Sequence, residues 1–81
     1  MSLSLRQLII FEATARLGRL TAAADEQALS QSAASQALKE LEMTLGYRLF
    51  SRNSRELVIT GMGREILPRV RDILSNVESL K

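Results

Sequence analysis

The segment Leu29–Glu42 reads LSQSAASQALKELE, and its chemistry differs between two faces once it is placed on a helix. At about 100° per residue, residues 31–45 divide into two sides. One side is apolar and is predicted to face the core: Ala34, Ala37, Leu38, Leu41 and Leu45. The opposite side is mostly small and polar: Ser32, Ser35, Gln36, Lys39 and Met43. Glu40 and Glu42 fall on the two flanks, so the centre of the exposed face carries no acid.

Small polar side chains on an exposed helix face suit the major groove of DNA. The groove admits one helix, and Gln can pair with adenine, Ser can donate or accept, and Lys can reach guanine or a phosphate. The free N–H groups at the start of a helix also attract phosphate. Taken alone, the face is equally consistent with an ordinary solvated surface that has serines near its N-cap.

Caps and glycines divide the rest of the chain into helices. The expected N-caps are Ser4, Thr21, Ser30 and Thr60, because a hydroxyl oxygen can accept from a free amide of the first turn. Ser4 and Gln7 also fit a capping box. The expected helix stops are Gly18 and Gly46. Pro68 falls inside the last helix, where it removes one backbone hydrogen bond.

Past Gly46 the apolar period changes to that of strands. The stretches RLFSR and ELVIT, around the turn-prone pair Asn53-Ser54, predict a two-stranded hairpin. Its inward residues are expected to be Leu49, Phe50, Leu57 and Ile59. Three helices, a hairpin and a long helix predict a mainly α fold, a winged helix-turn-helix with a β wing. We expect this domain over residues 1–60 and a linker or dimerisation helix over 61–81.

The composition excludes several classes of function. The 81 residues include no Cys and no His, which excludes disulfides, thiolate or imidazole metal sites, Cys nucleophiles and His bases. We therefore expect no enzyme, no catalytic residue, no metal and no cofactor. No apolar run approaches the roughly 18 residues of a membrane span and no signal-peptide pattern occurs, so we expect a cytoplasmic protein.

Positive charge gathers beside the predicted hairpin. The formal net charge is only +2, with a pI of about 9.7. From Tyr47 to Arg55, however, there are three arginines (Arg48, Arg52 and Arg55) and no acid. This suits an anionic partner docked on one face. A solvated loop would explain the cluster about as well if it stood alone.

The last helix carries an apolar seam with alternating steps of four and three residues, broadened by Leu67 and Leu74. A stripe of this length on so small a domain predicts a dimer. The expected dimerisation residues are Ile66, Val70, Ile73, Leu74, Val77 and Leu80. The alternative is that the stripe folds back onto the chain's own helices, which only part of it can do.

Specific residues at fixed spacing run from Phe11 to Gly63. Between these two they are Gly18, Thr21, Ala23-Ala24, Ser30-Gln31, Ala33, Ser35, Leu41-Glu42, Leu45-Gly46, Leu49-Phe50, Arg52 and Leu57 through Thr60. This run resembles the N-terminal DNA-binding domain of LysR-type transcriptional regulators. The resemblance implies a winged helix-turn-helix with its third helix in the major groove and its wing on the minor groove or the DNA backbone. It also implies that the last helix is a linker that dimerises.

Carried onto this sequence, the resemblance implies two sets of DNA contacts. The expected base contacts are Gln31, Ser32, Ser35, Gln36 and Lys39. The expected backbone and wing contacts are Arg19, Thr21, Ser30, Arg52 and Arg55. The expected partners are double-stranded DNA and a second copy of the chain, with no membrane.

The sequence departs from the family pattern at a few positions. Ser32 stands where the family often has Pro, Gln27 where it usually has Leu, and Ala22 where it often has a basic residue. Arg19 is the candidate to replace the phosphate contact that Ala22 lacks. Family members also carry a longer C-terminal effector-binding domain, whereas this sequence ends at Lys81. We therefore expect a truncated DNA-binding domain, with any small-molecule effector belonging to the missing part.

Two other functions are alternatives to DNA binding. The first is a winged-helix module for protein interaction or dimerisation that does not bind DNA. The acid-free helix face and the arginine-bearing wing favour DNA, because a protein interface requires neither. The second rival is an enzyme, but Lys39 as a catalytic amine would need burial, and it is expected on the exposed face.

Overall fold

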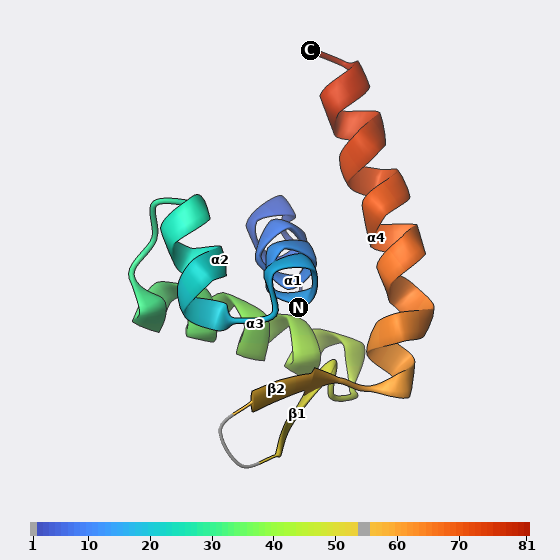
Figure 1. Cartoon of the computed structure of the whole chain (residues 1–81). Coiled ribbons are helices and arrows are strands. Elements are labelled where there is room, and N and C mark those ends of the chain that lie inside the picture. Colours follow the sequence, from blue (N-terminus) through green and yellow to red (C-terminus); the bar gives the residue numbers. More distant parts are fainter. Residues whose placement is uncertain (1, 54–55) are drawn as a thin grey trace.

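The computed structural model describes residues 2–53 and 56–81. Three helices come first, α1 (Leu5–Leu17), α2 (Leu20–Glu26) and α3 (Gln31–Leu45). The strands β1 (Phe50–Asn53) and β2 (Glu56–Ile59) and the helix α4 (Gly61–Ser79) follow. Figure 1 shows the three helices grouped together, the hairpin beneath them and α4 rising at one side. This arrangement confirms the predicted winged helix-turn-helix with a long last helix.

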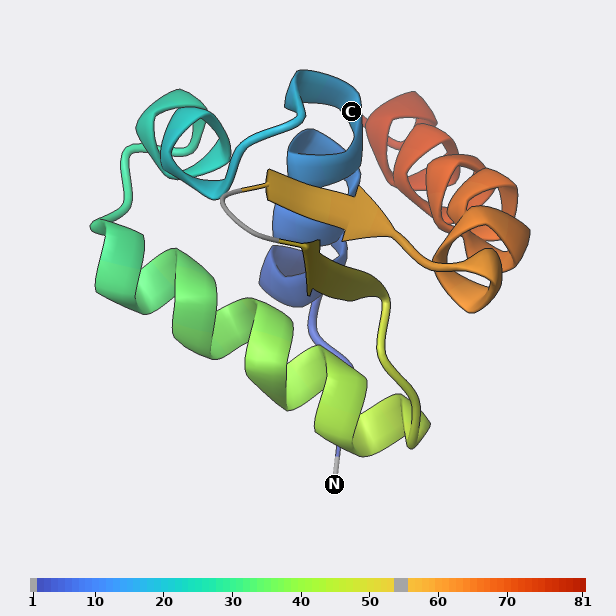
Figure 2. The ribbon, with the colours of Figure 1, turned by 60° about the horizontal axis from the view of Figure 1, so that its bottom comes forward.

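The core joins the three helices to the base of the wing. Its fully buried side chains include Ile10 and Phe11 of α1, Leu41 of α3 and Leu49 before β1. The ring centroid of Phe50 lies 5.6 Å from that of Phe11. In Figure 2 the hairpin accordingly lies over α1, between α3 and α4. The wing is therefore packed onto the helices at its base.

Helix α1 begins and ends at the predicted residues. The Ser4 hydroxyl accepts from the amide of Gln7, and the Gln7 side chain accepts from the amide of Ser4, both at 3.2 Å. At the other end Gly18 adopts the left-handed conformation (φ 81°), which glycine tolerates without strain. The capping box and the glycine stop are both confirmed.

Helix α2 begins earlier than expected, and the prediction that Thr21 caps it is wrong. Arg19, in an extended conformation, holds the N-cap position and makes no side-chain capping bond. Leu20 already lies in the helix and is only 8% exposed. The burial of its side chain in the core outweighs the hydroxyl cap that the sequence pattern indicates at Thr21.

Helix α3 matches its predicted bounds. The Ser30 hydroxyl accepts from the amide of Ala33 at 3.1 Å, and Gly46 ends the helix with φ 86°. The predicted apolar side packs inward: Ala34, Ala37, Leu38 and Leu41 are buried, and Leu45 is partly buried against the core. The opposite side is therefore left for another partner.

The wing is an antiparallel pair in which Phe50 lies opposite Ile59. Leu49 and Phe50 are buried, and Leu57 and Ile59 are partly buried against the core, as predicted. Ser54 of the predicted turn lies outside the described residues. The backbone of Asn53 belongs to β1.

Thr60 makes hydrogen bonds both to the segment that precedes β1 and to the first turn of α4. Its hydroxyl accepts from the amide of Gly63 at 3.0 Å, which confirms the predicted cap, and donates to the carbonyl of Arg48 at 2.7 Å. Its amide donates to the carbonyl of Leu49 at 2.9 Å. Gly63 lies so close to that carbonyl that a Cβ at this position would collide with it. The first turn of α4 is therefore held tightly against the residues that precede β1.

The seam of α4 divides into a packed part and an exposed part. Val70 is 3% exposed and belongs to the core of its own chain, and Ile66 and Leu74 pack partly against that core. Ile73 and Leu80, by contrast, are 44% and 87% exposed. The assignment of Val70 to a dimer surface is therefore corrected, since its side chain is already covered. None of the helices in the described ranges has the length and apolar character that crossing a membrane requires.

Candidate nucleic-acid interface

The solvent face of α3 presents the side chains that the sequence indicates as base contacts. Gln31, Ser32, Gln36 and Lys39 are exposed, and Ser35 is partly exposed. The Gln36 amide donates to the Glu40 carboxylate at 3.2 Å, one helical turn further on. A base that pairs with Gln36 must therefore compete with this exposed hydrogen bond.

Glu42 has a structural role that the sequence did not reveal. Its carboxylate is turned away from the face of α3 and accepts from the amides of Leu49 and Phe50, at 2.7 and 3.2 Å. It thereby satisfies backbone donors at the start of the wing. Its partners lie seven and eight residues away, beyond any helical spacing, so a wheel places Glu42 on a flank without indicating what it binds.

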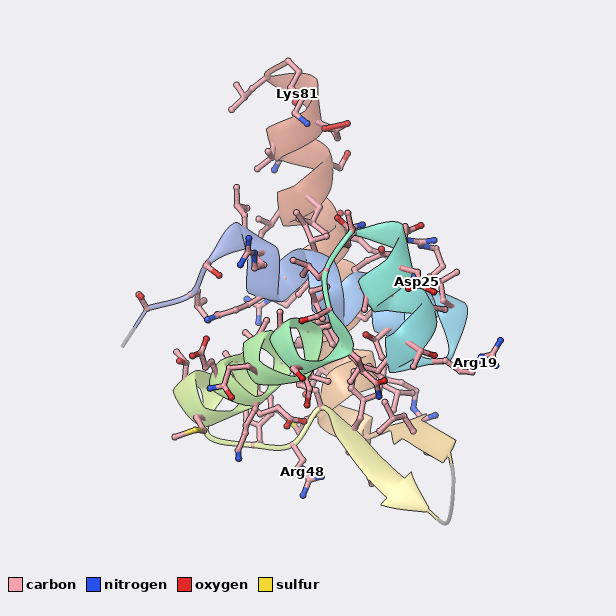
Figure 3. The ribbon with its side chains drawn as sticks, turned by 90° about the vertical axis from the view of Figure 1, so that its left-hand side faces the viewer. Arg19, Asp25, Arg48 and Lys81 are labelled. Atoms are coloured by element: carbon pink, nitrogen blue, oxygen red, sulfur yellow. The ribbon has the colours of Figure 1, made fainter. Side chains whose placement is uncertain are left out.

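Two arginines extend outward from segments that connect the helices and strands. Figure 3 shows Arg19 pointing outward before α2 and Arg48 pointing away from the segment between α3 and β1. Thr21 and Ser30 are also exposed, and the Ser30 hydroxyl oxygen already serves as the cap of α3. Arg55 and the side chain of Arg52 lie outside the described residues. The sequence places Arg48 in the basic cluster, but the expected contacts do not include it.

A groove of about 640 Å³ separates the second half of α3 from the wing. Ser35, Lys39 and Met43 line it from α3, Tyr47 and Arg48 from the connection, and Leu57 from β2. One wall therefore carries two of the predicted base contacts, and another carries Arg48. The groove combines apolar side chains with positive charge.

Paired charges lie where α1 meets α2 and α4. Arg16 of α1 lies 3.2 Å from Glu12 and 2.7 Å from Glu26 of α2, and Arg71 of α4 lies 3.4 Å from Glu12. Hydrogen bonds to Glu26 and then Glu12 raise the pKa of Arg16, and the Arg16 guanidinium lowers the pKa of Glu26. These pairs tie α2 and α4 to α1.

The described residues show no arrangement that suits metal chemistry. No group of three or more acidic side chains within residues 2–53 and 56–81 could hold a metal ion. Lys39 is exposed, so its ammonium lacks the burial that a catalytic amine requires. The chemistry that the surface can perform is hydrogen bonding and charge pairing with an anionic partner.

Comparison with known sequences identifies relatives along the whole chain. A family model described as "Bacterial regulatory helix-turn-helix protein, lysR family" matches residues 5–64. The RuBisCO operon transcriptional regulator of Allochromatium vinosum is 41% identical over 81 residues, which are 100% of this chain and 27% of that protein. The HTH-type transcriptional regulator YeiE of Escherichia coli (strain K12) is 40% identical over 81 residues, 100% of this chain and 28% of that protein. The chain thus spans about a quarter of the length of these relatives.

Solved structures agree in fold with the whole arrangement, α4 included. The oxidized form of OxyR from Corynebacterium glutamicum matches 99% of this chain and 24% of that chain, with a TM-score of 0.94 and 34% identity. The BenM DBD in its complex with catB site 1 DNA matches 95% of this chain and 86% of that chain, with a TM-score of 0.88 and 32% identity. The fold, the family model and the relatives together show that the chain belongs to the LysR family of bacterial regulatory helix-turn-helix proteins, as a winged helix-turn-helix DNA-binding domain.

Proposed function

We propose that α3 enters the major groove of double-stranded DNA, that the wing lies on the adjacent minor groove or backbone, and that two copies bind together. The observation that carries this proposal is the solvent face of α3, where small polar side chains surround Lys39 and no carboxylate occupies the centre. A carboxylate in that position would face phosphates and be repelled. The BenM DBD, which shares the fold and was solved in complex with DNA, supports DNA as the partner.

Base recognition is assigned to α3. The proposed base contacts are Gln31, Ser32, Ser35 and Gln36, and Lys39 can reach either a base or a phosphate. Gln36 is the most specific of these, because its amide can form two hydrogen bonds with adenine once it releases Glu40. Ser32 and Ser35 add hydroxyls that donate or accept without holding the helix away from the bases.

Contacts with the DNA backbone are assigned to the surroundings of α3. The proposed set is Arg19, Thr21, Ser30, Arg52 and Arg55. Arg19 and Thr21 extend from the start of α2, and Ser30 lies at the amino end of α3, where free N–H groups favour phosphate. Arg52 and Arg55 belong to the wing sequence.

Dimerisation is assigned to the outer part of α4. Ile73 and Leu80 are exposed, Val77 is partly exposed, and all three lie on one side of the helix together with parts of Ile66 and Leu74. Burial of this apolar surface against a second copy would remove it from water. A dimer would present two copies of α3 to two half-sites.

The test of base recognition compares a duplex selected from a random pool with an unselected duplex. Gln36→Ala should weaken binding to the selected duplex by about 1–3 kcal/mol and binding to the unselected duplex much less. Gln36→Glu, which keeps the shape but adds a negative charge, should weaken both. An equal loss on both duplexes with Gln36→Ala would remove Gln36 from base reading. Failure of the wild type to bind either duplex at low salt would favour the alternative function, a protein-interaction module.

The test of dimerisation is sedimentation at tens of micromolar, with variants chosen outside the core. Ile73→Glu combined with Leu80→Glu should give a folded monomer, because both side chains are exposed in the single chain. Ser75→Glu on the opposite side of α4 should leave the mass unchanged. A wild-type chain that sediments as a monomer would contradict the proposed dimer.

A further inference from the structure

The groove between α3 and the wing has a positively charged rim. Lys39 is exposed on one side, and the Arg48 side chain, 69% exposed, stands on the other. Glu42 is the one carboxylate among the described residues that line it, and its side chain is only 16% exposed. The hydrogen bonds from the amides of Leu49 and Phe50 occupy this carboxylate. The exposed charge of the groove is therefore positive.

Arg48 is anchored at its backbone and extended at its tip. Its carbonyl accepts from the Thr60 hydroxyl at 2.7 Å, and the neighbouring Leu49 side chain is fully buried. The Arg48 Nε lies 3.9 Å from the Glu42 carboxylate, which is beyond hydrogen-bonding distance. Figure 3 shows the side chain pointing away from the body of the molecule, beside the wing. A fixed backbone with an outward guanidinium is suited to hold an anion that approaches from solvent.

We propose that this groove seats the sugar-phosphate backbone of one DNA strand, with Lys39 and Arg48 as its phosphate contacts. The inference rests on the proposed function, in which α3 and the wing occupy neighbouring grooves. One strand separates a major groove from the minor groove beside it, so that strand must cross between α3 and the wing. The apolar side chains of Met43 and Leu57 in the groove suit contact with deoxyribose.

The two cations also offset an unfavourable local potential. Helix α3 ends at Leu45, and the carbonyl end of a helix carries partial negative charge that repels phosphate. Arg48 lies three residues past this end, and Lys39 lies less than two turns before it. Lys39 is thereby assigned to a phosphate, one of the two roles that its chemistry allows, and Arg48 becomes a contact that the sequence pattern did not single out.

The first experiment measures the salt dependence of binding to the selected and unselected duplexes. Arg48→Ala and Lys39→Ala should each weaken binding to both duplexes alike and reduce the slope of log K against log salt by about 0.9 for each bound copy, or about 1.8 for a dimer. Arg48→Lys should restore most of the slope. Lys81→Ala, which makes the same charge change at the opposite end of the molecule, should leave the slope unaltered. Thermal unfolding should be the same for all four variants, since these side chains are exposed.

The second experiment locates the phosphates directly. Single neutral methylphosphonates are placed in turn along each strand of the selected duplex. At one or two adjacent positions in each half-site the substitution should weaken binding of the wild type but not of Arg48→Ala, because the contact is already absent in that variant. The inference would be overturned if Arg48→Ala and Lys39→Ala kept the wild-type slope of log K against log salt. It would also be overturned if no methylphosphonate position distinguished the wild type from Arg48→Ala. Both outcomes would leave DNA binding itself intact. A loss with Lys39→Ala on the selected duplex alone would make Lys39 a base contact and overturn its part. A wild type that binds no duplex would instead overturn the proposed function itself.

Discussion

Arg16 and Arg19 are three residues apart in sequence, yet they belong to two regions that use charge in opposite ways. Arg16 is bonded to Glu12 and Glu26, at the junction of α1 and α2. Arg19 points into solvent, and within the described ranges no carboxylate lies at ion-pair distance from it (Figure 3). The same holds for Lys39 on α3. In the first region the arginine pairs with carboxylates and holds helices together. In the second region Arg19 and Lys39 are available to bind an anion.

The difference matters because a paired cation is a poor ligand for phosphate. An arginine that already bonds two carboxylates must lose them before it can bind an anion, and the carboxylates would then repel that anion. On the α3 side, Glu42 is occupied by backbone amides and Glu40 by Gln36. Substitutions in the two regions should therefore separate stability from DNA binding.

The largest effect on stability is expected at Leu41, a core residue on the inner face of α3. Leu41→Ala removes a fully buried side chain from the inner face of α3 and should lower the free energy of unfolding by about 2–5 kcal/mol. Met43→Ala, on the exposed face of the same helix, should change it by less than roughly 0.5 kcal/mol. Urea denaturation followed by circular dichroism measures both. Equal losses in the free energy of unfolding would mean that the buried and exposed faces of α3 contribute equally to stability.

The next effect concerns the junction of the wing with α4. Gly63→Ala places a Cβ against the carbonyl of Leu49 and the side chain of Ile59, and should destabilise the fold by about 1–3 kcal/mol. Gly61→Ala, where the space is open, is the matched control and should be neutral or slightly stabilising. Thermal unfolding of the two variants provides the comparison. Similar melting temperatures would show that the wing can move to make room for the added Cβ without loss of stability.

A smaller effect distinguishes two serines at the start of α3. Ser30→Ala removes the hydroxyl that accepts from the Ala33 amide and should cost about 1 kcal/mol of stability. Ser32→Ala removes an exposed hydroxyl and should leave stability nearly unchanged while weakening binding to the selected duplex. The reverse pattern would place the cap and the base contact at the wrong serines.

The smallest effect is expected from the exposed pair of Arg16 and Glu26. Because the guanidinium lowers the pKa of Glu26 in the folded chain, the pair adds stability above the ordinary glutamate pKa and loses it as pH falls through the lowered value. Glu26→Gln should therefore make the stability less dependent on pH between about 5 and 3. The effect should shrink in high salt, since the pair lies in solvent. Urea midpoints across this range, with Glu65→Gln as an exposed control, measure it; parallel curves for Glu26→Gln and the wild type would exclude the pair as a contributor.

Local patterns predicted much of the fold because their physical causes are local. The caps at Ser4, Ser30 and Thr60 depend on groups three residues apart, and the two faces of α3 depend only on helical period. Thr21 was misassigned as a cap because the position of α2 depends on how Leu20 packs, which is a tertiary effect.

The contacts that the sequence left out are those between distant segments. Val70 was expected on an exposed seam, but only the packing of α4 on α1 reveals that it is covered. Arg48 and Glu42 were visible as charges, yet their roles depend on the groove and on the backbone at the start of β1. Gln31 through Lys39 could be proposed from the wheel alone because their exposure follows from α3 itself.

The hydroxyl of Thr60 has a mechanical consequence for the whole chain. It holds the first turn of α4 through Gly63 and the carbonyl of Arg48 at the same time. Helix α4, with 19 residues, is about 28 Å long, and its first turn is attached at this hydroxyl. A tilt of the carboxyl end of α4 that moves its first turn must either break one of these two hydrogen bonds or move the backbone of Arg48 with it. A movement of α4 is thereby coupled, through the hydroxyl of Thr60, to the position from which Arg48 extends.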